Sequence, residues 1–184
     1  MKTLLKIIAI AIVLLGIETN SFAQLTINPS ASGTIVQTIT FLKLYDLDFG
    51  NMAVTTLSGY CVLHPMAGAN PTRDHFNGVT LPAFIGTPRA AAFTVTGVPS
   101  EYFTITILQV GIFISHTVLP ANQMLVNTFT CDQQQTAPDM WRQQLDALNG
   151  DATFYVGATC HVTGGQLAGL YTNAAGFPVT VNYE

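Results

Sequence analysis

Charged side chains are scarce in this sequence, and basic ones are the scarcest. Charged residues make up 9% of the chain, with six Lys and Arg against ten Asp and Glu. A surface that binds nucleic acid needs clustered cationic side chains to neutralise phosphates. Because the formal net charge is -4, the composition argues against such a surface, and we expect no nucleic-acid partner.

Long apolar runs are also missing after the N-terminus. The one long run extends over Leu4–Ile17 and has Lys2 and Lys6 at its start. It is followed by Ser21-Phe22-Ala23, with small residues at the positions that a signal peptidase reads. It is shorter than the roughly 20 residues that cross a bilayer. The pattern predicts a signal peptide at residues 1–23 and an exported protein, located in the periplasm, at the cell surface or outside the cell, with no membrane span after cleavage.

Recognisable catalytic and cofactor-binding motifs are absent from the sequence. It contains no nucleophile elbow, phosphate-binding loop or dinucleotide fingerprint. The four histidines have no ligand spacing and are interpreted as surface residues. Asp46 and Asp48 precede Phe49-Gly50, a sequence typical of a strand end rather than of a calcium loop. We therefore predict a protein that is not an enzyme, with no catalytic, cofactor-binding or metal-ligating residues and no cofactor.

What the sequence does contain is period-two alternation of apolar and polar residues, which is typical of strands with one buried face. The clearest cases are the final segment, residues 177–184, and residues 153–162. About nine such short segments, separated by Gly and Pro turns and without long helical patterns, predict a single all-β domain over residues 24–184, an antiparallel sandwich. Further strand candidates include residues 35–44, 79–84, 93–96, 103–107, 112–118 and 123–130.

One segment follows a helical period instead. Trp141, Leu145 and Leu148 share a helical face, Asp139 lies near the start and Gly150 follows the end. The spacing predicts one short helix over residues 138–148, lying across one end of the sandwich. The alternative is a loop held in place by Trp141.

Three cysteines occur, all in the part predicted to be exported, where disulfides are permitted. Cys61 and Cys160 fall at inward-facing strand positions, so they are interpreted either as small core residues or as a disulfide between two strands. Cys131 follows a strand candidate and precedes a Gln-rich stretch, and we interpret it as the thiol most available to another molecule.

Five short motifs, taken in order along the chain, resemble one family of secreted bacterial domains, the domain of unknown function 4402 family. The resemblance implies an immunoglobulin-like β-sandwich of the type seen in pilin and adhesin subunits, without an assigned catalytic site, so no functional residue is transferred from it. The three cysteines and a longer insertion around Trp141 depart from the family pattern. The motifs are Asp46-Leu47-Asp48-Phe49-Gly50, Ala92-Phe93-Thr94-Val95-Thr96-Gly97, Tyr155-Val156-Gly157-Ala158-Thr159, Gly169-Leu170-Tyr171 and Val179-Thr180-Val181-Asn182-Tyr183.

The segment that follows the predicted cleavage site supports a hypothesis about function. Leu25, Ile27 and Ile35 share one parity, so this segment can act as a strand that completes a groove in a neighbouring subunit. The alternative is that it pairs with its own sheet. The first hypothesis is an exported, non-enzymatic structural or adhesive module, fimbria-like or at the cell surface, which contacts copies of itself or another surface protein through strand edges.

The second hypothesis is a module that binds carbohydrate or another small ligand. Such a site needs exposed aromatic rings beside amide or carboxylate groups. Trp141 and Tyr171 are the main candidate ligand contacts, with Tyr155 and Asn173 as further candidates.

Overall fold

The computed structural model describes residues 26–35, 37–68, 71–82 and 86–184. Contacts divide the chain into two compact units, residues 1–35 and residues 36–184. The predicted signal peptide at residues 1–23 and Leu25 of the predicted assembly strand lie outside the described residues.

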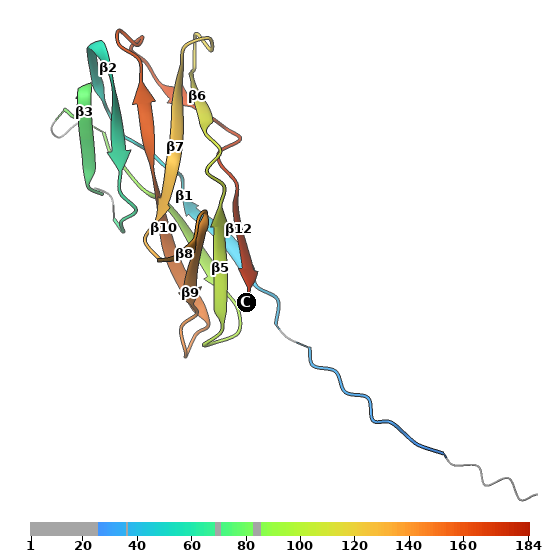
Figure 1. The fold of residues 1–184 in the computed structure, drawn as a ribbon. Helices are drawn as coiled ribbons and strands as arrows, with labels where there is room; N and C mark the ends of the chain where they lie inside the picture. The colour runs from blue at the N-terminus through green and yellow to red at the C-terminus, as the bar shows by residue number, and fades with distance from the viewer. Residues whose placement is uncertain (1–25, 36, 69–70, 83–85) are drawn as a thin grey trace, which may run out of the picture. The chain divides into compact units, whose positions relative to one another are not determined.

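The unit of residues 36–184 is built from two antiparallel sheets, and its described residues contain no helix (Figure 1). The larger sheet has the order β1-β4-β10-β7-β6-β11, with β2 pairing β10 and β3, and the smaller sheet has the order β12-β5-β9-β8. This all-β antiparallel sandwich confirms the predicted fold class. The described residues also include no helix that could span a membrane. The strands are β1 (Thr40–Tyr45), β2 (Ala53–Leu63), β3 (Arg73–Thr80), β4 (Ala91–Thr96), β5 (Tyr102–Ile107), β6 (Ile112–His116), β7 (Gln123–Cys131), β8 (Gln134–Ala137), β9 (Met140–Gln144), β10 (Asp151–Val162), β11 (Tyr171–Thr172) and β12 (Val179–Tyr183).

Strand β10 connects the two halves of the larger sheet. Residues 151–156 pair with β4, whereas residues 158–162 pair with β2 along the same edge of β10. On its other edge β10 pairs with β7, with a register shift between Gly157 and Thr159. Gly157 therefore lies where the neighbour of β10 changes from β4 to β2.

The core lies between the inward faces of the two sheets, as the alternation predicts. In β5, Phe103, Ile105 and Ile107 are fully buried while the threonines between them are partly exposed. From the larger sheet, Phe154 is also fully buried, and its ring centroid lies 5.2 Å from that of Phe93. Burial of such large apolar side chains is the main favourable contribution to folding.

The helix predicted over residues 138–148 is wrong. Met140–Gln144 forms β9, which pairs with β5 on one side and β8 on the other. Every second position of this segment is taken by Trp141, Gln143 and Leu145, which is the spacing of residues on one face of a strand. Of the three, Trp141 and Leu145 are buried. The Gln143 side chain also reaches inward, where its Nε2 donates to the Thr153 carbonyl. A polar residue at this inward position hides the period-two pattern and leaves an apparent helical spacing.

Residues 26–35 form no strand, and every side chain in this segment is exposed. The strand predicted from residue 35 begins instead at Thr40. Pro29 has no amide hydrogen to donate to a ladder, and Gly33 weakens a strand. The segment therefore provides Ile27 and Ile35 as apolar side chains that are 77% and 101% exposed.

Two segments that are mostly outside strands, residues 46–52 and 163–177, line cavities together with residues of the larger sheet, and the second of them contains the short strand β11. Arg73 on β3 holds the first of them, because its guanidinium donates to the carbonyls of Phe49 and Asn51, at 2.6 and 3.2 Å. Phe49 is buried against the core. Loops cover this half of the sheet less completely than strands would, and cavities remain beneath them.

Candidate functional site

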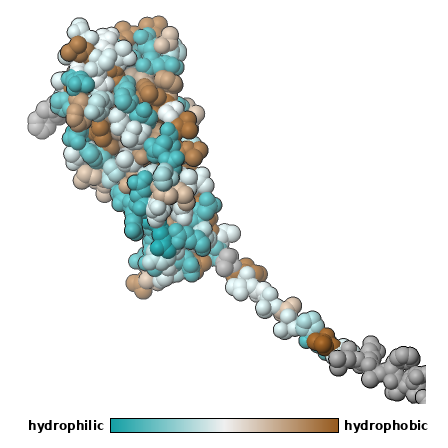
Figure 2. Space-filling view, in the orientation of Figure 1, coloured by the Kyte–Doolittle hydropathy of each residue, from teal (hydrophilic) through white to brown (hydrophobic). Residues whose placement is uncertain are grey.

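Two neighbouring cavities lie between the covering segments and the larger sheet. Their volumes are about 440 and about 740 Å³, and Asp48, Leu170 and Tyr171 line both. Apolar cavities with a few polar groups at the rim are the usual sites for ligands or for inserted side chains. These two cavities are therefore the candidate functional site. Figure 2 shows that hydrophobic residues are scattered over the visible face rather than gathered in one continuous patch.

The first cavity has an apolar floor and a polar rim. The floor comes from β6 and β7, through Ile112, Ile114 and Val126, together with Phe177 from the segment before β12. The ring of Phe177 stacks on Phe129 of β7 at 4.6 Å. The alternation of β6 and β7 places these aliphatic side chains on the inward face, which the smaller sheet leaves to the loops.

The acidic residues at the rim already have partners. Asp46 pairs with Lys43 in an exposed ion pair, which contributes little to stability. Asp48 accepts a hydrogen bond from the Gly50 amide at 2.7 Å, and its backbone forms a two-way bridge with Arg89. This geometry supports the interpretation of Asp48 as a strand-end residue. Asp48 therefore holds the turn at Gly50 and positions the covering segment.

Tyr171 forms part of the wall that separates the two cavities. Its hydroxyl donates to the Leu167 carbonyl at 2.6 Å and accepts from Gln166 Nε2 at 3.0 Å. Asn173 also lines the first cavity, but its side chain donates to the Phe113 carbonyl and accepts from two backbone amides. Both side chains therefore order the loop that covers the cavity.

The prediction that His116 is a surface residue is wrong, because this side chain is 6% exposed. Its Nδ1 accepts hydrogen bonds from the amides of Val118 and Leu119 at 3.1 and 3.0 Å. Because Nδ1 accepts, Nε2 carries the proton and donates to the Ala168 carbonyl at 3.2 Å. The ring also packs edge-on against Tyr171. His116 thus joins the covering loop to the end of β6.

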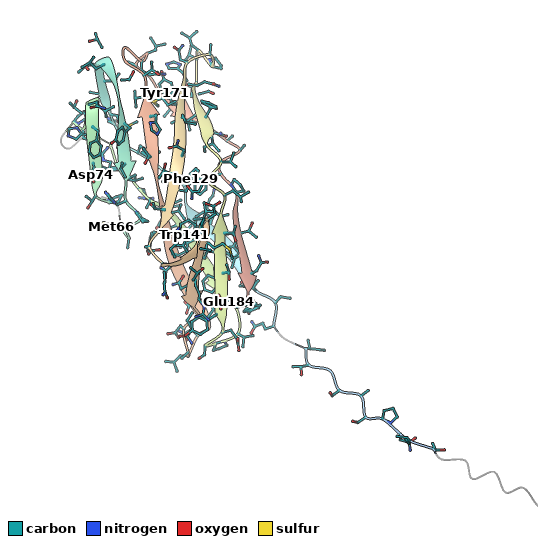
Figure 3. All side chains as sticks on the ribbon, in the orientation of Figure 1. Met66, Asp74, Phe129, Trp141, Tyr171 and Glu184 are labelled. Carbon is teal, nitrogen blue, oxygen red and sulfur yellow. The ribbon has the colours of Figure 1, made fainter. Side chains whose placement is uncertain are left out.

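The structure does not bring Trp141 and Tyr171 together. Trp141 lies on β9 of the smaller sheet, whereas Tyr171 lies on β11 at the far end of the larger sheet (Figure 3). Trp141 is 4% exposed, so it has no free ring face for stacking on a sugar. Of the two predicted ligand contacts, only Tyr171 lines the candidate site.

The histidines do not form a metal centre with other side chains in the described part of the chain, where no group of three His, Cys, Asp or Glu residues is placed to hold an ion. His64 pairs with Asp74 at 2.8 Å, and His75 Nδ1 lies 2.8 Å from the Val79 carbonyl. His161 contacts Asn127 at 2.9 Å.

The three cysteines are free thiols in the structure. Cys61 and Cys160 are fully buried on adjacent strands, and Cys131 is partly buried at the end of β7. Burial raises the pKa of Cys131 to about 12, and the nearby Asp132 carboxylate adds to this effect. Since the thiolate is the reactive form, its environment makes Cys131 a poor nucleophile.

This pKa predicts slow alkylation of Cys131. With the pKa at about 12 rather than 9.0, the thiolate fraction at pH 8 falls by two to three orders of magnitude. Iodoacetamide labelling of the folded protein, followed by mass spectrometry, should be slower by that factor than labelling in guanidinium chloride. The rate should rise about tenfold per pH unit above pH 8, because the thiolate fraction does so below the pKa. Labelling at the same rate in both states would contradict the effect of burial.

Comparison with protein-family models shows that residues 39–183 match the domain of unknown function DUF4402. The chain belongs to this family. The match covers the twelve strands found among the described residues of this DUF4402 domain, from β1 to β12, and residues 26–35 precede it. Comparisons with curated proteins and with solved structures gave no match.

Most residues that line the site of this DUF4402 domain were not among the predicted site residues. Leu170 and Ile112 come from distant parts of the chain, and Leu170 lies outside any strand. The signal that was available is Gly169-Leu170-Tyr171, which contributes to the family resemblance but does not by itself indicate a cavity wall. Gly169 is required there, since a Cβ would lie 2.1 Å from His116 Nε2.

Proposed function

We propose that this DUF4402 protein is an exported, non-enzymatic structural subunit that associates with copies of itself, in a fimbria-like or cell-surface assembly. In this proposal residues 26–35 of one copy act as the donor segment. The first cavity of another copy, beneath Leu170, acts as the acceptor. An extended peptide that adds to a sheet edge gains affinity from main-chain hydrogen bonds and specificity from side-chain pockets.

The observation that carries the proposal is the exposure of Ile27 and Ile35 in a segment outside any strand. Residues 26–35 contain no charged side chain, so their transfer into an apolar cavity carries no penalty for burying a charge. Moving each isoleucine out of water is favourable by about 1.5–3 kcal/mol when burial is complete.

The acceptor side is supported by the position of β1. In the described part of the chain β1 pairs with one strand, β4, so its other edge has unpaired backbone groups. Lys43 of β1 lines the first cavity. A strand added along this edge can therefore direct alternate side chains toward Ile112, Ile114 and Val126.

The donor segment is tested with two double variants of the full chain. Ile27→Asp with Ile35→Asp places charge on the apolar positions, whereas Asn28→Asp with Ser32→Asp places the same charge on neighbouring polar positions. We expect light scattering to show oligomers for the wild type and the control, and a monomer for the isoleucine variant. The reason is that burying an aspartate in the cavity costs several kcal/mol.

The acceptor is tested separately. Leu170 is 66% exposed at the cavity and Leu148 is 88% exposed in a turn, so Leu170→Asp and Leu148→Asp should both fold. We expect Leu170→Asp to be monomeric and Leu148→Asp to assemble. Mixing Leu170→Asp with the isoleucine double variant should restore heterodimers, because one variant keeps its donor segment and the other keeps its acceptor.

Three outcomes would count against the proposal. A wild-type monomer with and without reductant would exclude self-association, and a dimer lost on reduction would point to Cys131 as the link instead. Assembly that survives both aspartates at Ile27 and Ile35 would exclude the donor segment.

Ligand binding at the same cavities is the second candidate function, favoured by the position of Tyr171 between them. A monomeric wild type that binds a neutral oligosaccharide or another small ligand in calorimetry, with binding lost in Leu170→Asp, would favour this function.

A further inference from the structure

We propose that Cys61 and Cys160 form a cross-strand disulfide when the protein folds in an oxidising compartment. The two residues are direct partners in the antiparallel ladder between β2 and β10. Both are fully buried, and both are free thiols in the structure. The sequence alone leaves a bridge and a pair of small core residues as alternatives, and the register places the two cysteines directly opposite each other.

The ladder places the two residues at a separation that suits a disulfide. Directly opposed residues of an antiparallel pair have Cα atoms about 4.5–5.5 Å apart, and disulfides join Cα atoms about 4.4–6.8 Å apart. The register is held on both sides of the pair, by Ala158 opposite Leu63 and by Val162 opposite Gly59. Two directly opposed side chains lie on the same face of a sheet, here the buried face.

Cys131 is not an equivalent partner for either residue. It lies at the end of β7, where its partner in the ladder with β10 is Val156 rather than Cys160. Cys160 is instead opposite Val126 on that strand. The odd thiol of the chain is therefore Cys131, and the pair on β2 and β10 is the one that the fold brings into register.

The reaction is a thiol–disulfide exchange with a small disulfide such as oxidised glutathione. The thiolate of one cysteine attacks a glutathione sulfur, which forms a mixed disulfide and releases one glutathione thiolate. The second cysteine, as its thiolate, then attacks the protein sulfur of the mixed disulfide, which forms the Cys61–Cys160 bond and releases the second glutathione. The protein thiols lose two electrons and two protons, and oxidised glutathione is reduced to two thiols.

We expect the Cys61–Cys160 disulfide to form while the protein folds rather than after it has folded. In the folded protein, burial raises the pKa of Cys61 to about 11 and that of Cys160 to about 12, and neither side chain is accessible. The closed loop contains roughly 100 residues, so the bond should reduce the entropy of the unfolded chain considerably. We expect the melting temperature of the oxidised protein to exceed that of the reduced protein by roughly 5–15 °C.

The experiment refolds the full chain with either oxidised glutathione or excess reductant. Each sample is then denatured, alkylated and weighed by mass spectrometry, and its disulfide-linked peptides are mapped. We expect one alkylated thiol, at Cys131, and a peptide link between Cys61 and Cys160 in the oxidised sample, and three alkylated thiols in the reduced sample. Three alkylated thiols after oxidative refolding, or a link that includes Cys131, would overturn the proposal.

Two variants separate the bond from a packing effect. Cys61→Val keeps an apolar side chain in the core, and its melting temperature should be the same after oxidising and reducing refolding. Cys131→Ala should retain the full difference between the two preparations. A difference that persists in Cys61→Val would also overturn the proposal. The redox conditions are set in vitro. The disulfide mapping and the melting temperatures therefore do not depend on whether the protein is exported or self-associates.

Discussion

Replacing Phe154 with alanine is expected to lower the free energy of unfolding by about 3–5 kcal/mol. Phe154 is fully buried on β10, with its ring stacked at 5.2 Å on Phe93 and at 6.1 Å on Phe41. Truncation removes both contacts and leaves a cavity between β10, β4 and β1, which a central strand cannot easily close. In thermal unfolding, the melting temperature should fall by roughly 6–20 °C.

A matched truncation at an exposed site gives the control. Leu148 is 88% exposed in the turn before β10, so Leu148→Ala should change the free energy of unfolding by less than about 0.5 kcal/mol. If Phe154→Ala were equally mild, the three stacked rings would not form a close-packed part of the core, and the assignment of the inward face of β10 would be wrong.

The strands that alternate cleanly were the predictable part of this fold. In β5 and β10, apolar residues at every second position identify the buried face without any knowledge of the partner strand. In β12, Val181 and Tyr183 pack against the core as their parity predicts. The Tyr183 hydroxyl also accepts a hydrogen bond from the Val98 amide at 2.8 Å, which ties the final strand to the turn before β5.

The region around Trp141 was not predictable, because an apolar spacing of four residues fits both the two-residue period of a strand and the 3.6-residue period of a helix. Trp141 and Leu145 are four positions apart, which suits both a helical face and one face of a strand. The residue that distinguishes them is Gln143, and its amide Oε1 is buried without a hydrogen-bond partner. A polar side chain that is turned inward cannot be recognised before the pairing of β9 with β5 is known.

The candidate site was harder still to predict, since it depends on which part of the larger sheet the smaller sheet covers. Alternation identifies the inward faces of β6 and β7 but not whether strands or loops lie over them. The burial of His116 shows the same limit, because its partners are backbone groups of the loops. Tyr171 was a predicted ligand contact, but only the folded arrangement places it in the lining of both cavities.

Replacing Gly157 with alanine should strongly disrupt the larger sheet, although it adds a single methyl group. A Cβ at this position would lie 2.1 Å from the Leu63 carbonyl oxygen, 2.8 Å from the Pro65 nitrogen and 2.9 Å from the carbonyl carbon of His64. All three are backbone atoms, so the end of β2 must move away from β10. We expect a loss of about 3 kcal/mol, at the upper end of overpacking effects, and a fall in the melting temperature of roughly 6–12 °C.

The comparison that isolates this clash is Gly33→Ala. A Cβ added at Gly33 would have no atom within 4 Å, and this residue has no positive φ, so the substitution adds the same methyl group without a steric clash. We expect a change below about 0.5 kcal/mol. The tight contact lies where the strand that neighbours β10 changes from β4 to β2. The loss of stability from Gly157→Ala should therefore be local to β2. Hydrogen exchange should therefore rise first at β2 and β3 and leave β5 and β12 protected. Equal loss of protection across both sheets would instead mean that the two halves of the larger sheet unfold as one unit.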